Sequence, residues 1–252
     1  MRQLTLAALD GVPEIGAGDD LGAVTLAALA GSGMALRDGD VIVLAQKIVS
    51  KSEGRRVALA GVEPSARALE LAGQTGKDPR LVELVLRESR TVLRSRPGVL
   101  IVEHRLGIVI ANAGIDQSNV PDGDAHALLL PLDPDASCAR LRASLRAAAG
   151  VDVAVLMVDS AGRAWRNGVV GIAIGAAGLP AVVDRRGHLD RCGRPLLITQ
   201  IAVADELAAA ASLLMGQADE GCPIVHARGL PYARRESAAR ELIRPLGEDL
   251  FR

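Results

Sequence analysis

Aromatic side chains are almost absent from this chain, whose 252 residues include one Trp, one Tyr and one Phe. Proteins that bind single-stranded nucleic acid stack successive bases on neighbouring aromatic rings, but Trp165, Tyr232 and Phe251 are far apart in the sequence. The net charge of -1 provides no basic field that would attract a polyanion. Both shortages predict that the protein has no nucleic-acid partner.

Cysteines and long apolar runs are also scarce. Cys138, Cys192 and Cys222 form no close pair, match no zinc-site spacing and are odd in number, which argues against a disulfide framework. No stretch reaches the roughly 18 apolar residues that a membrane span needs. The first residues, MRQLTLAALDG, lack the apolar segment and cleavage site of a secretory signal. We expect a cytoplasmic protein with no membrane association.

The chain is rich in aliphatic residues, and apolar side chains make up 49% of it, enough for a sizeable core. Periodicity and helix caps (Asp19 or Asp20, Asp78 and Asp133) predict strands and helices in mixed order. We therefore predict an α/β protein, more closely a mixed α+β fold, with residues 1–252 in one domain. The predicted helices cover 21–33, 65–76, 78–89, 135–150, 203–216 and 231–252, the last interrupted at Pro245, and the predicted strands cover 41–45, 99–103, 107–112, 151–158 and 221–229.

Two carboxylates follow predicted strands. Asp116 lies in NAGIDQSNV, just beyond the apolar run GIVIA, and Asp159 comes directly after VDVAVLMV. Ligand sites in sheet proteins gather at strand ends. Two carboxylates with the hydroxyl of Ser160 would be hard oxygen ligands for Mg²⁺ or Mn²⁺. The alternative interpretation is structural, with Asp116 forming a turn and Asp159 capping a loop.

Two lysines and a glycine-rich run raise the question of nucleotide binding. Lys47 and Lys51 follow strand 41–45, where they could bind phosphates as point charges; a solvated basic face is the alternative. The run 168–180 fits neither common glycine-rich phosphate motif, so we interpret it as tight backbone packing or a strand bend. Any nucleotide would then be held by a site outside the common motifs.

Arg163 and Arg166 flank Trp165 shortly after Asp159. Their guanidinium forks could clamp a phosphorylated or carboxylated substrate, or they could form a structural salt bridge. The histidines have no partner at metal-ligand spacing, and we interpret most of them as surface or structural residues: His104, His126, His188 and His226.

Seven segments in order resemble the coenzyme F420-0:γ-glutamyl ligase family: VPEIGAGDDL, DGDVIVLAQKIVSKSEGR, ANAGIDQSNV, LLPLDPDASCARLR, DSAGRAWRNG, ADELAAAASLLMGQADEGCPIVHARG and RPLGEDLFR. The resemblance covers nearly the whole chain. It implies a family-specific fold with two subdomains and a groove between them, and a homodimer. The chain is similar to the stand-alone form of the family rather than to the form fused to a nitroreductase-like domain.

The resemblance implies a GTP-dependent ligase. Such an enzyme joins the amine of L-glutamate to the lactyl carboxylate of a deazaflavin cofactor precursor, releases GDP and phosphate, and adds further glutamates through γ-linkages. The implied cofactors are Mg²⁺ or Mn²⁺ at two sites, often with a monovalent cation such as K⁺. Transfer of the γ-phosphoryl group would give an acyl phosphate, which the amine then attacks. The implied partners are these small molecules.

The resemblance also implies roles for individual residues. Asp116 and Asp159 would share the first metal, and Ser160 and Gln217 would help to hold the second. Asp116, Asp159 and Lys51 are the predicted catalytic residues, with Lys47 or Lys51 compensating phosphate charge. The residues implied in nucleotide binding are Val12, Pro13, Glu14, Ile15, Gln46, Lys47, Lys51, Asn119, Met215, Gly216, Gln217, Ala218, Asp219, Glu220, Gly221 and Cys222.

The chain departs from the family pattern at four positions. Ser160 stands where Thr is usual, Ala164 where Pro is common, Gly171 where Asp is frequent, and Arg185 where Tyr is usual. The predicted metal ligands are retained, so we expect activity, but the acceptor could differ. The competing functions are a metal-dependent phosphotransferase or phosphohydrolase acting on another small carboxylate, and a non-catalytic GTP-binding protein.

Overall fold

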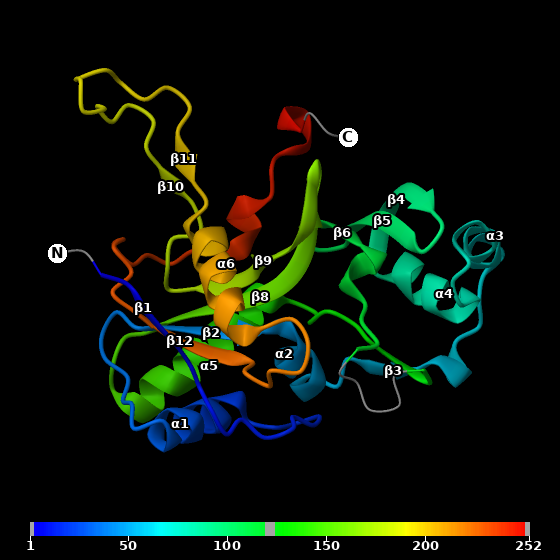
Figure 1. Cartoon of the computed structure of the whole chain (residues 1–252), viewed down its shortest axis with the longest axis horizontal. Helices are drawn as coiled ribbons and strands as arrows, with labels where there is room; N and C mark the ends of the chain where they lie inside the picture. Colours follow the sequence, from blue (N-terminus) through cyan, green and yellow to red (C-terminus); the bar gives the residue numbers. More distant parts are fainter. Residues whose placement is uncertain (1–2, 119–123, 250–252) are drawn as a thin grey trace.

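The computed structural model describes residues 3–118 and 124–249, which form a mixed α/β structure with several sheets (Figure 1). The main sheet has five strands in the order β1-β12-β2-β8-β9. β2 and β8 run parallel, and the other neighbours are antiparallel. The strands are β1 Thr5–Ala8, β2 Val41–Ala45, β8 Ala154–Arg163, β9 Arg166–Ala177 and β12 Ile224–Arg228.

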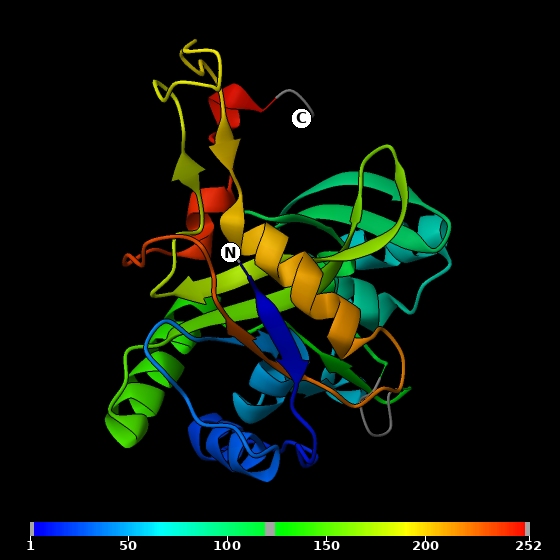
Figure 2. The same ribbon diagram turned by 60° about the vertical axis from the view of Figure 1, so that its left-hand side comes forward.

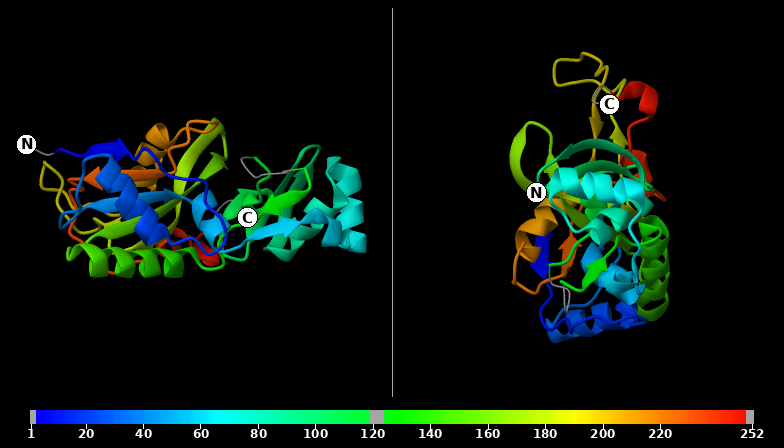
Figure 3. Two further views of the ribbon diagram at one scale, coloured as in Figure 1. Left: turned by 90° about the horizontal axis from the view of Figure 1, so that it is seen from below. Right: turned by 90° about the vertical axis from the view of Figure 1, so that its right-hand side faces the viewer.

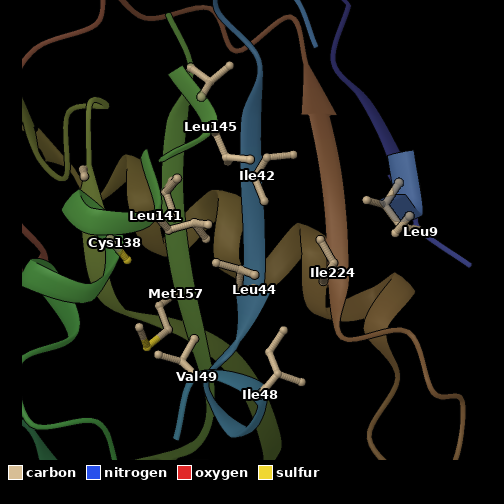
Figure 4. Close-up of a cluster of buried hydrophobic side chains, with 14 of the residues drawn as sticks. Leu9, Ile42, Leu44, Ile48, Val49, Cys138, Leu141, Leu145, Met157 and Ile224 are labelled. Carbon is tan, nitrogen blue, oxygen red and sulfur yellow. The ribbon is translucent and has the colours of Figure 1, made fainter. Parts of the chain in front are cut away.

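Helices cover both faces of the main sheet (Figures 1 and 3). Side chains alternate between the two faces of a strand, so Ile42 and Leu44 pack towards α1 and α5, whereas Val41 and Val43 pack towards α6. Figure 4 shows the first of these clusters. The apolar run of β2 is therefore buried on both faces. The helices are α1 Leu21–Gly31, α5 Pro134–Ala149 and α6 Val203–Met215.

A second group of elements has its own buried cluster and lies at one end of the long axis (Figure 3). Helices α3 and α4 pack there against the three-stranded sheet β4-β5-β6. The short pair β3–β7 and helix α2 lie between this group and the main sheet (Figure 1). The bounds are α2 Gln46–Ser52, β3 Arg56–Ala58, α3 Ala66–Thr75, α4 Pro79–Arg87, β4 Ser89–Arg96, β5 Val99–His104, β6 Val109–Ala111 and β7 His126–Leu128.

Two β-ribbons extend beyond the main sheet (Figure 2). β2 ends at Ala45, opposite Val158, so residues 159–163 of β8 pair with β9 and overhang the end of β2. The second ribbon is a long arm whose base is the pair β10 Val183–Asp184 and β11 Gln200–Ile201.

The helix caps and the interpretation of the glycine run are confirmed. Asp20, Asp78 and Asp133 each accept backbone N–H bonds at the start of a helix. In β9, a Cβ added to Gly171 would lie 2.6 Å from the Ala208 carbonyl oxygen of α6. β9 and α6 are therefore in contact through backbone, where only glycine fits.

The predicted helix at 231–252 is wrong within the described residues. Only two short 3-10 helices form there, Ala239–Leu242 and Leu246–Glu248. Side chains that a helix would direct to solvent instead bind the body of the protein: Arg235 donates to the Val182 carbonyl, and Arg240 pairs with Asp135. These tertiary contacts outweigh the helical periodicity of the sequence.

The predicted helix 78–89 ends at Arg87 and is followed by β4, which the sequence pattern did not predict. Every side chain of β4 is partly or fully exposed. The strand therefore lacks a clear alternation of apolar and polar residues.

No helix among residues 3–118 and 124–249 is long and apolar enough to cross a membrane. The division into two subdomains with a groove, and the single domain 1–252, stay predictions.

Candidate functional site

A cavity of about 600 Å³ opens where β2 ends and its parallel pairing with β8 stops. β2 turns directly into α2 at Gln46, while β8 continues past it, and this difference leaves a notch at the edge of the sheet. The lining residues are Val12, Pro13, Glu14, Ile15, Ala45, Gln46, Lys47, Ile48, Lys51, Val158, Asp159, Ser160, Ser212, Met215, Gly216, Gln217, Ala218, Asp219, Glu220, Gly221, Cys222 and Pro223.

Almost every predicted site residue with a described position lies at this cavity. The segments 12–15, 46–51, 159–160 and 215–222 are far apart in the sequence, and the fold brings them to one place. Asp116 is not among the lining residues but contacts one of them, Lys47. Asn119 lies outside the described residues. The predicted set therefore converges on one location.

Lys47 links the cavity to the loop that carries Asp116. Its Nζ lies 2.7 Å from Asp116 Oδ2 and donates to Ser118 Oγ at 2.9 Å. Although burial acts to raise the pKa of Asp116, hydrogen bonds from Lys47 and Ser118 lower it below its ordinary value. Asp116 is thus held ionised beside a fixed cation.

The turn before Asp116 directs the chain into this position. Asn112 and Ala113 have φ angles of 51° and 55°, a left-handed conformation that is uncommon outside glycine. The side chain of Asn112 accepts a hydrogen bond from the backbone N–H of Leu100, and Asp116 then pairs with Leu128 by two backbone hydrogen bonds. The residues of this stretch therefore form a turn that also presents a carboxylate.

Asp159 is in a different electrostatic state. Burial raises its pKa to about 7, and the nearby charge of Asp116 adds to this increase, against a hydrogen bond from the backbone N–H of Ser160. A carboxyl group that loses its proton only near neutral pH is poorly compensated by its own protein. It would be stabilised as an anion by a bound cation.

Ser160 and Gln217 lie side by side. The Ser160 hydroxyl donates to Gln217 Oε1 at 2.7 Å, although 57 residues separate them in the sequence. Gln217 follows the end of α6 at Met215, in a loop that begins at Gly216 with a φ of 73°. The two predicted ligands of a second metal thus come together from β8 and from the α6 loop.

The same loop surrounds a carboxylate of its own. Glu220 accepts a hydrogen bond from the backbone N–H of Ala218, and further backbone N–H groups of the loop help to lower the pKa of Glu220. Gly216 lies beside the Glu220 carboxylate with a φ of 73°, a backbone conformation that residues with a Cβ rarely adopt, so glycine is favoured there. Converging backbone N–H groups of this kind also bind anions.

The donor set fits a hard divalent cation. No group of three or more His, Cys, Asp or Glu side chains suited to a metal occurs in the part of the chain described, so a soft or all-protein metal cage is not formed there. Two carboxylates, a hydroxyl and an amide oxygen are nevertheless donors that Mg²⁺ and Mn²⁺ accept, with water and substrate phosphates completing the coordination. The poorly compensated Asp159 supports this interpretation.

Other candidate residues lie elsewhere. Arg163, Trp165 and Arg166 are at the tip of the β8–β9 hairpin and do not line the cavity. His104 and His226 are buried and pair with Glu88 and Asp40, which confirms a structural interpretation for these two.

Sequence reasoning assigned no role to some residues of the site. Ala45, Ile48, Ser212 and Pro223 line the cavity beside predicted residues, and Ser118 contacts Lys47. Ile48 and Ser212 could have been found from helical spacing, since each lies within a turn or so of a predicted residue on its helix. Ala45 and Pro223 contribute mainly backbone and shape.

The fold and the cavity are those of a sheet protein with lysines and oxygen donors where its strand pairing ends, as in many α/β enzymes. Comparison with known proteins makes the assignment specific. The family model for F420-0:Gamma-glutamyl ligase matches residues 11–229. The chain belongs to this family.

Curated relatives match along almost their whole length. The chain is 48% identical over 251 residues to the coenzyme F420:L-glutamate ligase of Methanothermobacter thermautotrophicus, covering 99% of each chain. It is 49% identical to the protein of that name from Methanopyrus kandleri, covering 93% of this chain and 92% of the relative. For the protein of that name from Halobacterium salinarum the identity is 44%, with 97% and 94% covered.

Proposed function

We propose that the protein is a GTP-dependent ligase that adds L-glutamate to the lactyl carboxylate of coenzyme F420-0, and then further glutamates through γ-linkages. The observation that supports it most is the match to curated ligases along nearly their full length. The convergence of the predicted nucleotide and metal residues on one cavity adds independent support. Further supporting features are the strand-end location and the charges of the cavity.

In this proposal the chain supplies positioning and charge rather than a protein nucleophile. Lys47 and Lys51 face the cavity and would hold the phosphates of GTP. Mg²⁺ or Mn²⁺, held by Asp116, Asp159, Ser160 and Gln217, would neutralise charge on the β- and γ-phosphates. The acceptor carboxylate would take the γ-phosphoryl group, giving GDP and an acyl phosphate.

The second half of the reaction joins glutamate. Its amine would attack the acyl carbon, the C–O bond to phosphate would break, and inorganic phosphate would leave as the amide forms. The amine must lose a proton in this step. A cavity of about 600 Å³ exceeds the need of a small ion and is open enough for a nucleotide and a second reactant.

The proposal includes a homodimer, and the β10–β11 arm supports it. Leu189, Leu197 and Ile198 are 68%, 78% and 87% exposed on this arm. Large aliphatic side chains gathered on a projection are typical of protein interfaces.

The proposal also includes a monovalent cation such as K⁺, which would help to neutralise the charge of the phosphates. The two-subdomain organisation would position the acceptor.

Mass spectrometry of a complete reaction tests the function. Purified protein is incubated with F420-0, L-glutamate, GTP and Mn²⁺, and the acceptor mass is followed. Increments of one or more glutamyl units are expected, with GDP formed only when acceptor and glutamate are both present. GTP consumption without glutamate would instead support a phosphotransferase or phosphohydrolase. GTP binding without turnover would support a non-catalytic protein.

A further inference from the structure

The tip of the β8–β9 hairpin exposes the chain's one tryptophan. Trp165 is 90% exposed and has a φ of 65°, in the left-handed region that bulky residues rarely adopt. Figure 2 shows the hairpin standing clear of the main sheet. Folding therefore gains little from this indole, although tryptophan is usually among the most buried large side chains.

Two arginines flank this indole. Arg163 and Arg166 are paired in register across the hairpin, and both are exposed. In residues 3–118 and 124–249 neither guanidinium has a hydrogen-bond or ion-pair partner. Some other exposed arginines are neutralised locally, as Arg186 is by Asp184. The tip thus combines an open aromatic face with uncompensated positive charge, a surface complementary to an aromatic anion.

The hairpin connects this surface with the cavity. Asp159 and Ser160 line the cavity, and the same strand continues to Arg163 at the tip. Four residues of extended strand span about 13 Å. A molecule with its carboxylate at Asp159 and its ring at Trp165 would therefore need an extended linker of comparable length.

We propose that Arg163, Trp165 and Arg166 bind the ring-bearing end of the acceptor. The ligand would be a planar heteroaromatic group joined by a flexible anionic linker to the carboxylate that is ligated. The indole would stack on the ring, and the two guanidiniums would pair with the anionic groups of the linker. This inference rests on the proposed function, which requires an acceptor with a ring and an anionic arm.

The single tryptophan provides a direct measurement. F420-0 is titrated into the wild-type protein while Trp165 fluorescence is recorded, and separate titrations use GTP with Mn²⁺ and L-glutamate alone. Saturable quenching by F420-0, with little change from the other two ligands, is expected. Unchanged fluorescence at F420-0 concentrations that support turnover would overturn the inference.

Variants at the tip separate binding from chemistry. Trp165→Leu and Arg166→Gln should each raise the KM for F420-0 by about tenfold. This is a modest effect for the loss of one stacking contact or one charge-assisted hydrogen bond. The kcat and the KM for GTP should stay within about twofold of the wild-type values. The variants lose only acceptor binding that is equally strong in the ground state and the transition state. An unchanged KM for F420-0 in both variants would overturn the inference.

Arg96→Gln is the matched control. Arg96 is an exposed arginine at the end of another hairpin, β4–β5, and it too has no ion-pair partner among the described residues. Its loss removes one positive charge at a similar position in a ribbon without touching the β8–β9 tip. An equal rise in KM in this variant would attribute the effect to overall charge and overturn the inference.

The outcomes distinguish this inference from the proposed function. Glutamylated product without quenching contradicts the tip site alone. Quenching without product contradicts the ligase and supports the tip site. Two other results would together overturn the inference and assign the tip to contact with a second copy of the chain. Trp165 fluorescence would change with protein concentration, and sedimentation would show weaker self-association of Trp165→Leu than of the wild type.

Discussion

Lys47 and Lys51 bind different carboxylates although they lie one turn apart on α2. Lys47 pairs with Asp116, which comes from the loop before β7, whereas Lys51 pairs with Glu14, which comes from the segment after β1. The Lys51 side chain is 14% exposed and that of Glu14 is 72% exposed. The two cations are therefore held in place by ion pairs, which would lower the cost of ordering them around the phosphates of the proposed nucleotide.

Replacing Asp116 by Asn should abolish metal-supported turnover while leaving the fold intact. The change removes one predicted ligand charge and the partner of Lys47 but keeps the size of the side chain. We expect a loss of at least about 100-fold in kcat/KM with Mn²⁺, measured by GDP release. Asp124→Asn, an exposed aspartate of the same loop, is the control and should behave as wild type. Full activity of Asp116→Asn would contradict the metal assignment.

Replacing Lys51 by Ala should raise the KM for GTP. The loss of a nearly buried ammonium facing the cavity removes a phosphate contact, and we expect an effect of about tenfold. Glu14→Gln leaves the lysine in place and removes only its exposed partner, so its effect should be smaller. Steady-state kinetics with varied GTP measures both. Equal effects would show that the ion pair shapes the cavity rather than that Lys51 binds phosphate.

The residue types of the site could be predicted from the sequence, but the protonation states of its carboxyl groups could not. Asp116 and Asp159 were both recognisable as carboxylates beside strands. The prediction that Asp159 follows the end of its strand is wrong, since β8 runs from Ala154 to Arg163 and Asp159 lies within it. The sequence does not show that Lys47 holds Asp116 ionised while burial leaves Asp159 with a pKa of about 7. Such states depend on contacts across 71 residues of chain, as between Lys47 and Ser118, and these arise only after folding.

At the scale of elements, one buried carboxylate joins α4 to two other segments. Glu88 at the end of α4 accepts hydrogen bonds from Arg55 at 2.9 Å and from Arg105 at 3.0 Å, with His104 at 3.5 Å. Arg55 also donates to the carbonyl of Leu130. Burial acts to raise the pKa of Glu88, but these partners lower it to about 2. The second group of elements is thereby tied to the chain that leaves α2.

Replacing Glu88 by Gln should destabilise the protein by about 3 kcal/mol at neutral pH, because it leaves buried cationic groups without their anion. The pKa of Glu88 is about 2 in the folded state and near 4.5 when unperturbed. Its stabilisation is therefore present above about pH 4.5 and is lost as the pH falls towards 2.

Denaturant unfolding of wild type and Glu88→Gln between about pH 7 and pH 3 measures this difference. The difference in the free energy of unfolding between the two proteins should decrease as the pH is lowered. Glu70→Gln is the control, since Glu70 pairs with Arg67 on the surface and both side chains are 55% exposed; it should change stability by no more than about 0.5 kcal/mol. If the difference in the free energy of unfolding between wild type and Glu88→Gln stayed constant with pH, this would contradict the role of the carboxylate charge.

Elements with strong local signals were predictable, and those set by tertiary contacts were not. β2 and β8 are continuous apolar runs, and α5 begins at Asp133 and Pro134, a cap and first-turn pair. β4 carries arginines along most of its length and pairs with β5 through two irregularities of register. The segment after Pro231 has helical periodicity, but its charges bind other elements instead.

At the scale of the whole molecule, the cavity exists because the two central strands end at different places. The order β12-β2-β8 in the sheet brings the loop after α6 beside α2. No local pattern encodes this order, since it depends on crossovers between distant strands. Recognisable family segments predicted which residues would meet there, whereas periodicity alone predicted only that ligands gather at strand ends.

The β10–β11 arm gives the last prediction, which concerns assembly. Leu197 and Ile198 are among the most exposed large apolar side chains in the described ranges, and the arm projects from the body (Figure 2). Exposed aliphatic groups on a projection gain free energy when a second copy covers them. We expect sedimentation to give a dimer, and the double variant Leu197→Glu, Ile198→Glu to give a folded monomer, because it would place two charges in the proposed interface.

The matched control is Leu69→Glu on α3. Leu69 is 55% exposed and lies in the second group of elements, away from the arm. It should leave the dimer intact, so that dissociation by the arm variant reflects its location rather than added negative charge. Circular dichroism checks that both proteins keep their helices. A dimer that survives the arm substitutions would show that the subunits associate through another surface, and the exposed leucines of the arm would then need a different partner.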